Sequence, residues 1–289
     1  MVIPKYWAKA EAKVSLKSGL PFTISCWRYS NESQNAAESL AVAAANQRAA
    51  TLSSGIKEPS EYPDQPPREE VVKEFTDING NQIGAVTRNS QGALILNCAS
   101  LAIVDIDMTT ASFGSVIRSL KNLFSKPKVP KGKNKFKAWE VLATEHLNNL
   151  FAKSKGWTGK LYRTKAGLRL FVTHSNLNPQ DPGLVSFMKG CRVDPLYFKL
   201  CQVQKSFRAR LTPKPIRLGL KRPGVEFPYN DEDQLKLKDW LPRYEKASQE
   251  FATCEFVQSF GATSMPSQFT EMISYHDEVA KVGSSLPLA

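Results

Sequence analysis

The first quarter of the chain combines β-type alternation with one helical stretch. Apolar and polar residues alternate over 5–14 and 22–29, which predicts two strands. The alanine-rich stretch 36–52 predicts a helix. Residues 59–67 read Pro-Ser-Glu-Tyr-Pro-Asp-Gln-Pro-Pro, a composition that excludes regular structure. The chain is therefore predicted to open with a β-β-α module followed by a connector.

The remaining sequence mixes both periodicities. Asn79-Gly80 lies between two β-prone runs and predicts a hairpin. The predicted strands are 71–75, 82–88, 93–97, 101–107, 160–163, 168–173, 207–211 and 254–260. The predicted helices are 111–124, 137–153, 181–189, 194–201, 231–251 and 266–281. This mixture predicts an α+β fold with mixed or antiparallel sheets and flanking helices. We expect a β-β-α module over 1–58, a sheet-based core over 68–222 and an extension over 223–289 that packs on the core to form one compact unit.

Composition sets limits on the class of protein. The chain has 289 residues, of which 42% are apolar, enough for a sizeable core. No apolar run reaches the ~18–20 residues of a membrane span, and the N-terminus lacks the apolar core of a signal peptide, so we expect a cytoplasmic protein with no membrane partner. The five cysteines form no C-x-x-C pair, which favours reduced, mostly buried thiols over a structural zinc site.

An acidic pair ends one predicted strand. Residues 101–107 read Leu-Ala-Ile-Val-Asp-Ile-Asp, and residues two apart in a strand point to the same side. Asp105 and Asp107 therefore share a face, where a hard cation such as Mg²⁺ or Mn²⁺ would offset their repulsion. The alternative is a strand end at which both acids simply reach solvent. Asp194 is a candidate third acid, although Asp194-Pro195 fits a helix N-cap equally well.

The formal net charge of +12 indicates a polyanionic partner. The alternative is a basic protein without such a partner. Part of the positive charge is concentrated in two clusters. A lysine-rich segment without acids predicts either a solvated loop or a clamp on a nucleic-acid backbone. Its members are Lys126, Lys128, Lys131, Lys133, Lys135 and Lys137. The second cluster includes the predicted strand 207–211. One arginine side chain there can bind two phosphate oxygens at once. The segment 195–222 has no Asp or Glu and contains Lys199, Lys205, Arg208, Arg210, Lys214, Arg217, Lys221 and Arg222. The alternative is a structural role in which the arginines pair with distant acids.

The predicted hairpin between residues 160 and 173 is also basic. Arg163, Lys165 and Arg169 lie close together along it, and Gly167 would allow a phosphate to approach the backbone. These three side chains are candidate nucleotide-binding groups. A plain basic hairpin is the alternative interpretation.

The order of these features resembles the catalytic core of the archaeo-eukaryotic primase superfamily, which includes primase-polymerases. Asp105 and Asp107 match its Asp-x-Asp/Glu motif, and Thr164-Lys-Ala-Gly-Leu-Arg169 is similar to its Ser/Thr-x-x-Gly-x-His motif, with arginine in place of histidine. The resemblance covers roughly residues 70–215, and Asp194 is a candidate for the third acid. It implies an RRM-like catalytic module beside an N-terminal αβ module.

The leading hypothesis is a metal-dependent nucleotidyltransferase that acts on nucleoside triphosphates and nucleic acid. Asp105, Asp107 and Asp194 would be its catalytic acids, and the first two would hold Mg²⁺ or Mn²⁺. A non-catalytic nucleic-acid or nucleotide binder on the same scaffold, and a metal-dependent nuclease, remain as alternatives. Protein partners are not indicated by any pattern in the sequence.

Overall fold

A computed structural model describes residues 3–15, 19–55, 66–108, 134–261 and 265–289. The chain forms two compact units, Val2–Val71 and Val72–Ala289. Residues 223–289 belong to the same unit as 72–222. The helix predicted over 111–124 lies outside the described residues.

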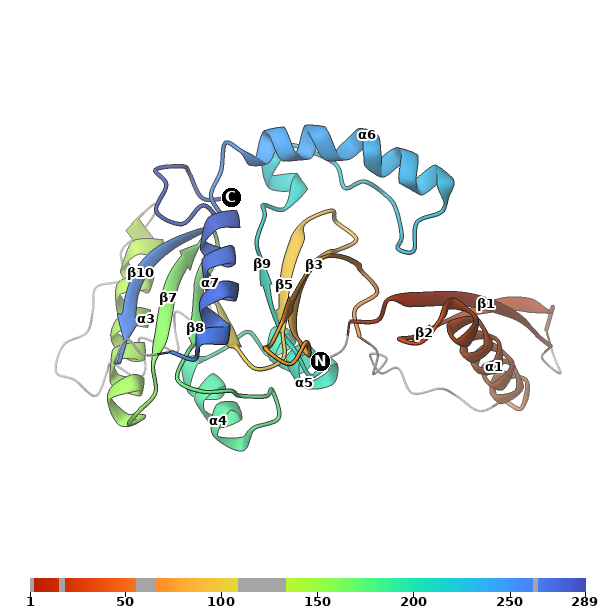
Figure 1. The fold of residues 1–289 in the computed structure, drawn as a ribbon, viewed down its shortest axis with the longest axis horizontal. Helices are drawn as coiled ribbons and strands as arrows, with labels where there is room; N and C mark the ends of the chain where they lie inside the picture. The colour runs from red at the N-terminus through yellow and green to blue at the C-terminus, as the bar shows by residue number, and fades with distance from the viewer. Residues whose placement is uncertain (1–2, 16–18, 56–65, 109–133, 262–264) are drawn as a thin grey trace. The chain divides into compact units, whose positions relative to one another are not determined.

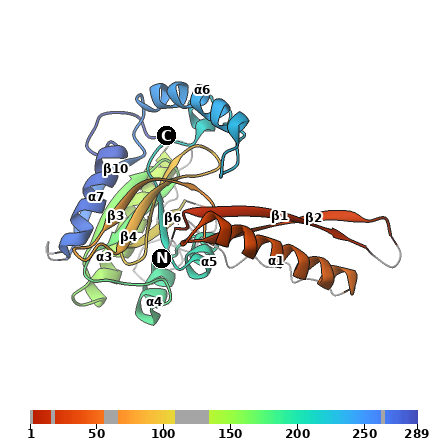
Figure 2. The same cartoon turned by 45° about the vertical axis from the view of Figure 1, so that its right-hand side comes forward.

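The first unit is the predicted β-β-α module. Strands β1 (Tyr6–Val14) and β2 (Phe22–Ser30) pair antiparallel, and α1 (Gln34–Ser53) packs along one face of the hairpin (Figure 2). The alanines of α1 meet those of β1, because their small side chains permit a close helix–strand approach. The helix begins where the Ser33 hydroxyl accepts a hydrogen bond from the Ala36 N–H.

The second unit contains two four-stranded antiparallel sheets (Figure 1). One sheet has the order β3-β4-β5-β9, and its strands are β3 (Glu70–Thr76), β4 (Gln82–Arg88), β5 (Leu94–Cys98) and β9 (Phe207–Arg210). The other has the order β10-β7-β8-β6, and its strands are β6 (Ala102–Asp107), β7 (Gly159–Thr164), β8 (Gly167–Val172) and β10 (Cys254–Phe260). The edge strands β6 and β9 of the two sheets lie against each other.

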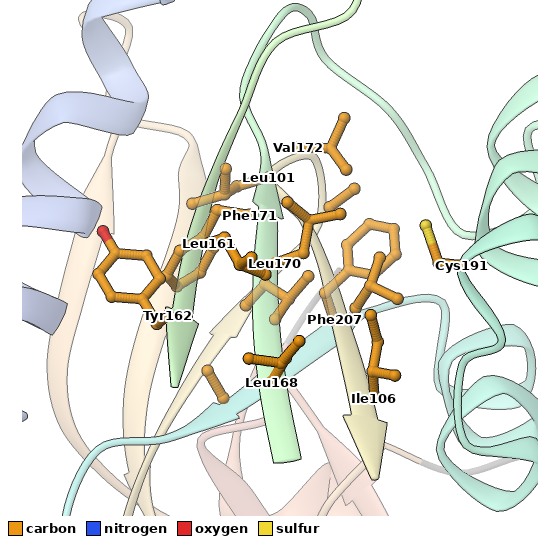
Figure 3. Packing of buried hydrophobic residues seen from close by; sticks show 14 of the residues in the cluster. Leu101, Ile106, Leu161, Tyr162, Leu168, Leu170, Phe171, Val172, Cys191 and Phe207 are labelled. Carbon is orange, nitrogen blue, oxygen red and sulfur yellow. The ribbon is translucent and has the colours of Figure 1, made fainter. Parts of the chain in front are cut away.

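Two long helices cover the two faces of the β10-β7-β8-β6 sheet. The first is α3 (Asn134–Lys153), whose buried Trp139 and Leu147 pack near Ile106. The second is α7 (Ser267–Val279), whose His276 ring contacts the rings of Tyr162 and Phe171. Buried leucines and aromatic residues fill the space around strands β6, β7 and β8 (Figure 3).

Three further helices and one 3₁₀ helix complete the unit. The α-helices are α4 (Pro182–Cys191), α5 (Pro195–Gln204) and α6 (Asp231–Ser248), and the 3₁₀ helix is η1 (Pro215–Leu218). The described residues thus form an α+β protein with antiparallel sheets and six α-helices. The predicted α+β class is confirmed. None of the described helices combines the length and hydropathy that crossing a membrane requires.

Candidate functional site

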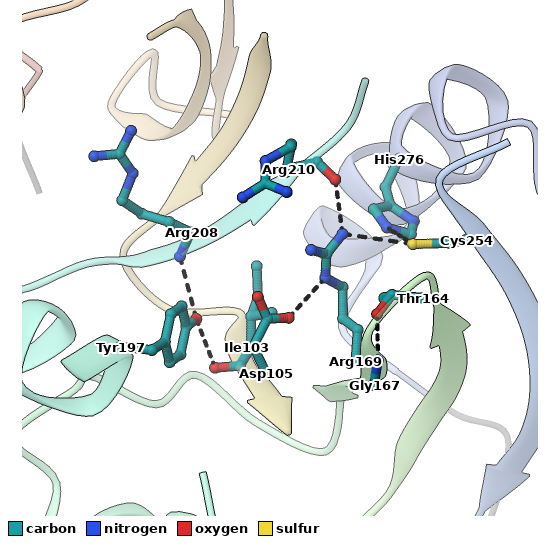
Figure 4. A network of polar contacts seen from close by, with 10 residues as sticks. All are labelled: Ile103, Asp105, Thr164, Gly167, Arg169, Tyr197, Arg208, Arg210, Cys254 and His276. Atoms are coloured by element: carbon teal, nitrogen blue, oxygen red, sulfur yellow. Dashed lines mark hydrogen bonds and ion pairs between the residues drawn. The ribbon is translucent and has the colours of Figure 1, made fainter. Parts of the chain in front are cut away.

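Asp105 and Asp107 line one cavity at the end of β6. Strand pairing sets Asp105 opposite Arg169 and Asp107 opposite Gly167 of β8. The cavity has a volume of about 200 Å³ and is also lined by Asp194, Arg169 and cations contributed by β9 and η1. The prediction that the two acids share a face is therefore confirmed. Figure 4 shows the residues around Asp105.

Arg169 is a buried residue that lines this cavity, and it is only 4% exposed. Its Nε donates to Asp105 Oδ1 over 3.0 Å, and its Nη1 donates to the backbone oxygen of Arg210 over 2.8 Å (Figure 4). Burial alone would lower the pKa of this guanidinium, but Asp105 reverses that effect and the pKa is raised. Arg169 is thus a fixed, permanently charged partner of the first acid.

Three further cations crowd the same cavity. Arg210 comes from β9, Lys214 precedes η1, and Arg217 lies within η1. Burial, together with repulsion from Arg169 and Arg217, lowers the pKa of Arg210 to about 10, and its buried Nε has no hydrogen-bond partner. Repulsion from Arg210 lowers the pKa of Lys214. Cations that disfavour one another at close range are stabilised by an anion placed between them.

The two acids of the motif have unequal surroundings. Burial raises the pKa of Asp107, and repulsion from Asp105 and Asp194 raises it further, while Lys214 and Arg210 oppose the change. Asp105 instead has Arg169 as an ion-pair partner at 3.0 Å. A divalent cation would relieve the repulsion acting on Asp107.

The structure confirms the N-cap predicted for Asp194, while its part as a third acid remains a prediction. Its side chain caps α5 by accepting a 2.7 Å hydrogen bond from the Tyr197 N–H, and its own N–H donates to the backbone oxygen of Asp105 over 3.2 Å. These bonds fix Asp194 at the wall of the cavity. Capping engages only one of its carboxylate oxygens.

The cavity can hold a magnesium-type ion only if water and phosphate complete its coordination shell. In the described part of the chain, no three Asp, Glu, His or Cys side chains are arranged to hold a metal ion. Mg²⁺, however, commonly binds one or two carboxylates and takes its other ligands from water and phosphate. Asp105 and Asp107 would supply that carboxylate pair, and a phosphate in the adjacent cationic half of the cavity would complete the shell.

Several predicted phosphate-binding residues lie elsewhere. Arg163 pairs with Leu168 in the β7–β8 register, so it points to the sheet face opposite Arg169, and its guanidinium bonds Glu140 at 2.5 Å and Glu255 at 2.6 Å. Lys165 is exposed in the turn and is not among the cavity-lining residues. The Arg208 side chain is directed away from Asp105 (Figure 4). Only Arg169, Arg210, Lys214 and Arg217 of the predicted set line the cavity.

The structure describes only part of the lysine-rich segment. Lys126, Lys128, Lys131 and Lys133 lie outside the described residues, and Lys135 is described in its backbone alone. Lys137 is an exposed residue near the start of α3 and does not line the cavity. The predicted clamp remains a prediction.

A polar layer behind the cavity has no counterpart in the sequence interpretation. The Sγ atom of Cys254 lies 3.5 Å from Arg169 Nη1 and 3.7 Å from His276 Nε2, and His276 Nδ1 lies 2.8 Å from Asp277 Oδ1. All five cysteines are free and buried, as expected from their spacing. Tyr197 was also missed, and its hydroxyl donates to the Ile103 backbone oxygen over 2.9 Å. These residues are far apart in the sequence, so no local pattern could have grouped them.

Comparisons with protein-family models, with curated proteins and with solved structures gave no match.

Proposed function

We propose that the protein is a metal-dependent nucleotidyltransferase of the primase-polymerase type. The observation that carries the proposal is the convergence of Asp105 and Asp107 with four cations in one cavity. A carboxylate pair for a divalent ion beside positive charge for phosphates is the arrangement that phosphoryl transfer requires. In this interpretation, the β10-β7-β8-β6 sheet and its helices form the RRM-like catalytic module.

Each group in the cavity has a distinct task in this proposal. Arg210, Lys214 and Arg217 would bind the phosphates of a nucleoside triphosphate, and their mutual repulsion would fall as the anion enters. Arg169 would hold Asp105 in a fixed orientation. Mg²⁺ or Mn²⁺ held by Asp105 and Asp107 would neutralise charge on the phosphoryl oxygens. Such an enzyme would work on nucleic acid in the cytoplasm.

One observation favours a second candidate, a non-catalytic nucleotide or nucleic-acid binder. Arg169 engages Asp105 Oδ1 directly, so one oxygen of the carboxylate pair is already committed to a protein cation. If Arg169 neutralises Asp105 fully, the site has no need of a metal ion, and the remaining cations form an anion-binding site.

A labelled-oligonucleotide assay with nucleoside triphosphates and Mn²⁺ or Mg²⁺ tests the proposal. Lengthening of the oligonucleotide by the wild type, lost in Asp105→Asn/Asp107→Asn, supports it. Glu145→Gln/Glu271→Gln removes two exposed carboxylates from α3 and α7 and is the matched control. Equal lengthening by wild type and Asp105→Asn/Asp107→Asn would overturn the assignment.

The same assay separates the alternatives. Metal-dependent shortening of the oligonucleotide would indicate a nuclease. Salt-sensitive binding that persists in EDTA, with no change in oligonucleotide length, would indicate the binder.

A further inference from the structure

A second basic cavity lies beside the first in the same unit. It is a groove of about 470 Å³ between the segment after η1 and helix α6. Lys221 and Arg222 line one side, and Arg243 lines the other. Among the described residues that line it, Asp239 is the one acid, so positive charge predominates.

The groove and the carboxylate cavity are lined by neighbouring residues of the same segment. Arg217 lines the cavity, and Gly219 lines the groove only two residues later. Two residues of backbone span at most ~7 Å, so the two hollows open next to each other along η1. Between Phe207 and Arg222 the chain carries no Asp or Glu. The cations of the two hollows are called the track below, and its members are Arg210, Lys214, Arg217, Lys221, Arg222 and Arg243.

Three of the four groove cations have no carboxylate partner within the described part of the chain. Among the described residues, Lys221 and Arg222 make no ion pair, and Arg243 donates only to the Asp239 backbone oxygen. Lys236, at the same groove, differs because it is paired with Glu232 and Asp233. Charge that is exposed and unpaired at three positions is available to an anionic ligand.

The track is held in a fixed shape by α6. The Trp240 indole N–H donates to the Lys221 backbone oxygen over 2.8 Å, and the Tyr244 hydroxyl donates to the Pro213 backbone oxygen over 2.7 Å. The two rings stack with centroids 4.5 Å apart. Anchoring on both sides means that little ordering of the protein is needed when a ligand binds.

We propose that this track binds the phosphate backbone of a single-stranded nucleic acid and leads it from the α6 groove to the Asp105/Asp107 cavity. Regularly spaced phosphates match a line of unpaired cations. A single strand fits better than a duplex because a cavity of about 200 Å³ cannot admit two paired strands. The exposed Ile216, on η1 between the two hollows, offers an apolar contact to an unstacked base. The proposal extends the proposed function, on which it depends for the role of the cavity.

Fluorescence anisotropy with a labelled single-stranded oligonucleotide of about 20 nucleotides, in EDTA and over a range of salt, tests the track. Arg222→Gln/Arg243→Gln removes two charges from the groove. Lys238→Gln/Lys246→Gln removes two exposed charges from α6 outside the groove and is the matched control. Loss of two phosphate contacts should reduce the salt-dependence slope by ~1.4 and weaken binding about 25-fold near 0.1 M salt. The control should bind like the wild type.

Equal weakening by both double variants would overturn the track, because only overall charge would then matter. Unchanged binding by the groove variant would overturn it too, as would tighter binding of a duplex or of polyglutamate. Binding is measured in EDTA and repeated with Asp105→Asn/Asp107→Asn, so it does not depend on turnover. A protein that binds through the groove but extends nothing would refute the proposed function alone; one that extends oligonucleotides yet binds independently of the groove would refute the track alone.

Discussion

The Nε atom of Arg169 donates to Asp105 Oδ1 over 3.0 Å, and this ion pair divides the Asp-x-Asp motif into two unlike acids. Asp105 is bound to a buried cation of the neighbouring strand. Asp107, one step further along the same face, experiences burial and the repulsion of Asp105 and Asp194. Asp105 therefore stabilises the sheet in addition to lining the cavity, whereas Asp107 contributes mainly to the cavity.

This difference predicts opposite effects of two similar substitutions on stability. Asp105→Asn removes the carboxylate from the buried Arg169 and should lower the free energy of unfolding by ~2–3 kcal/mol, somewhat less than a fully buried pair because the Asp105 side chain is 32% exposed. Asp107→Asn relieves repulsion and should leave stability unchanged or raise it by up to ~0.5 kcal/mol. Urea unfolding at neutral pH measures both. Equal losses in the two variants would contradict the division of the pair.

Strand β8 approaches β6 so closely at Gly167 that a side chain has no room there. A Cβ atom at this position would lie 2.1 Å from the Ile106 backbone oxygen and 3.0 Å from the Asp107 Cα. Because both neighbours are backbone atoms, Gly167→Ala must push β6 away, at a cost of ~1–3 kcal/mol, and must displace Asp107. The expected result is lower stability together with weaker Mn²⁺ binding, measured by urea unfolding and by the paramagnetic effect of bound Mn²⁺ on water relaxation.

Gly183→Ala is the control for that substitution, since its added Cβ would meet only the Asp181 side chain, at 3.2 Å. Normal Mn²⁺ binding by Gly167→Ala would show that the metal does not depend on the position of Asp107.

The local features of this chain were accessible from its sequence. The Asn79-Gly80 hairpin, the helix that begins at Asp181, the cap at Asp194 and the acids on β6 all follow from patterns of a few residues, and the structure confirms them. Such signals are short in range because caps and turns satisfy their own backbone groups.

Strand register could not be predicted in the same way. Arg163 and Arg169 looked equivalent in the sequence, but the hairpin pairs Tyr162 with Arg169 and Arg163 with Leu168. Arg163 therefore points toward Glu140 of α3, and Arg169 toward Asp105. A shift of one residue in register exchanges the two faces, so the facing of each arginine depends on the pairing of strands rather than on local spacing.

His276 predicts a loss of stability in mild acid. It is fully buried, and burial lowers its pKa below 6.5, although the neighbouring Asp277 opposes the change. Below pH 6.5 the unfolded chain therefore binds a proton that the folded chain does not. Stability is complete above pH 6.5 and is lost as the pH falls toward the lowered folded-state value, by up to ~1.4 kcal/mol per pH unit.

Urea unfolding of wild type and His276→Gln between pH 7.5 and 5 checks this expectation. The variant is less stable at pH 7.5 because it loses its contacts with Cys254 and Asp277, but its stability should fall less on acidification. Parallel pH profiles for the two proteins would exclude His276 as the source of the acid sensitivity.

Substitutions of Arg210 and Arg163 should separate anion binding from stability, because Arg210 lines the cavity and Arg163 pairs with Glu140. Arg210 is held near other cations without a partner for its Nε, so Arg210→Met should leave stability unchanged or raise it by up to ~1 kcal/mol. Arg163 instead neutralises the buried Glu140, so Arg163→Gln should cost ~1–3 kcal/mol, discounted because the Arg163 side chain is 32% exposed.

Tripolyphosphate provides the probe of binding, because it carries the charge of a nucleotide without its base. At ten times its Kd it should stabilise the wild type by about 1.4 kcal/mol, a gain that Arg163→Gln keeps and Arg210→Met loses. The measurement is urea unfolding with and without the anion at fixed ionic strength. If Arg163→Gln were the variant that lost the gain, phosphate would bind on the α3 face of the sheet, and the cavity around Asp105 and Asp107 would have to be abandoned as the nucleotide site.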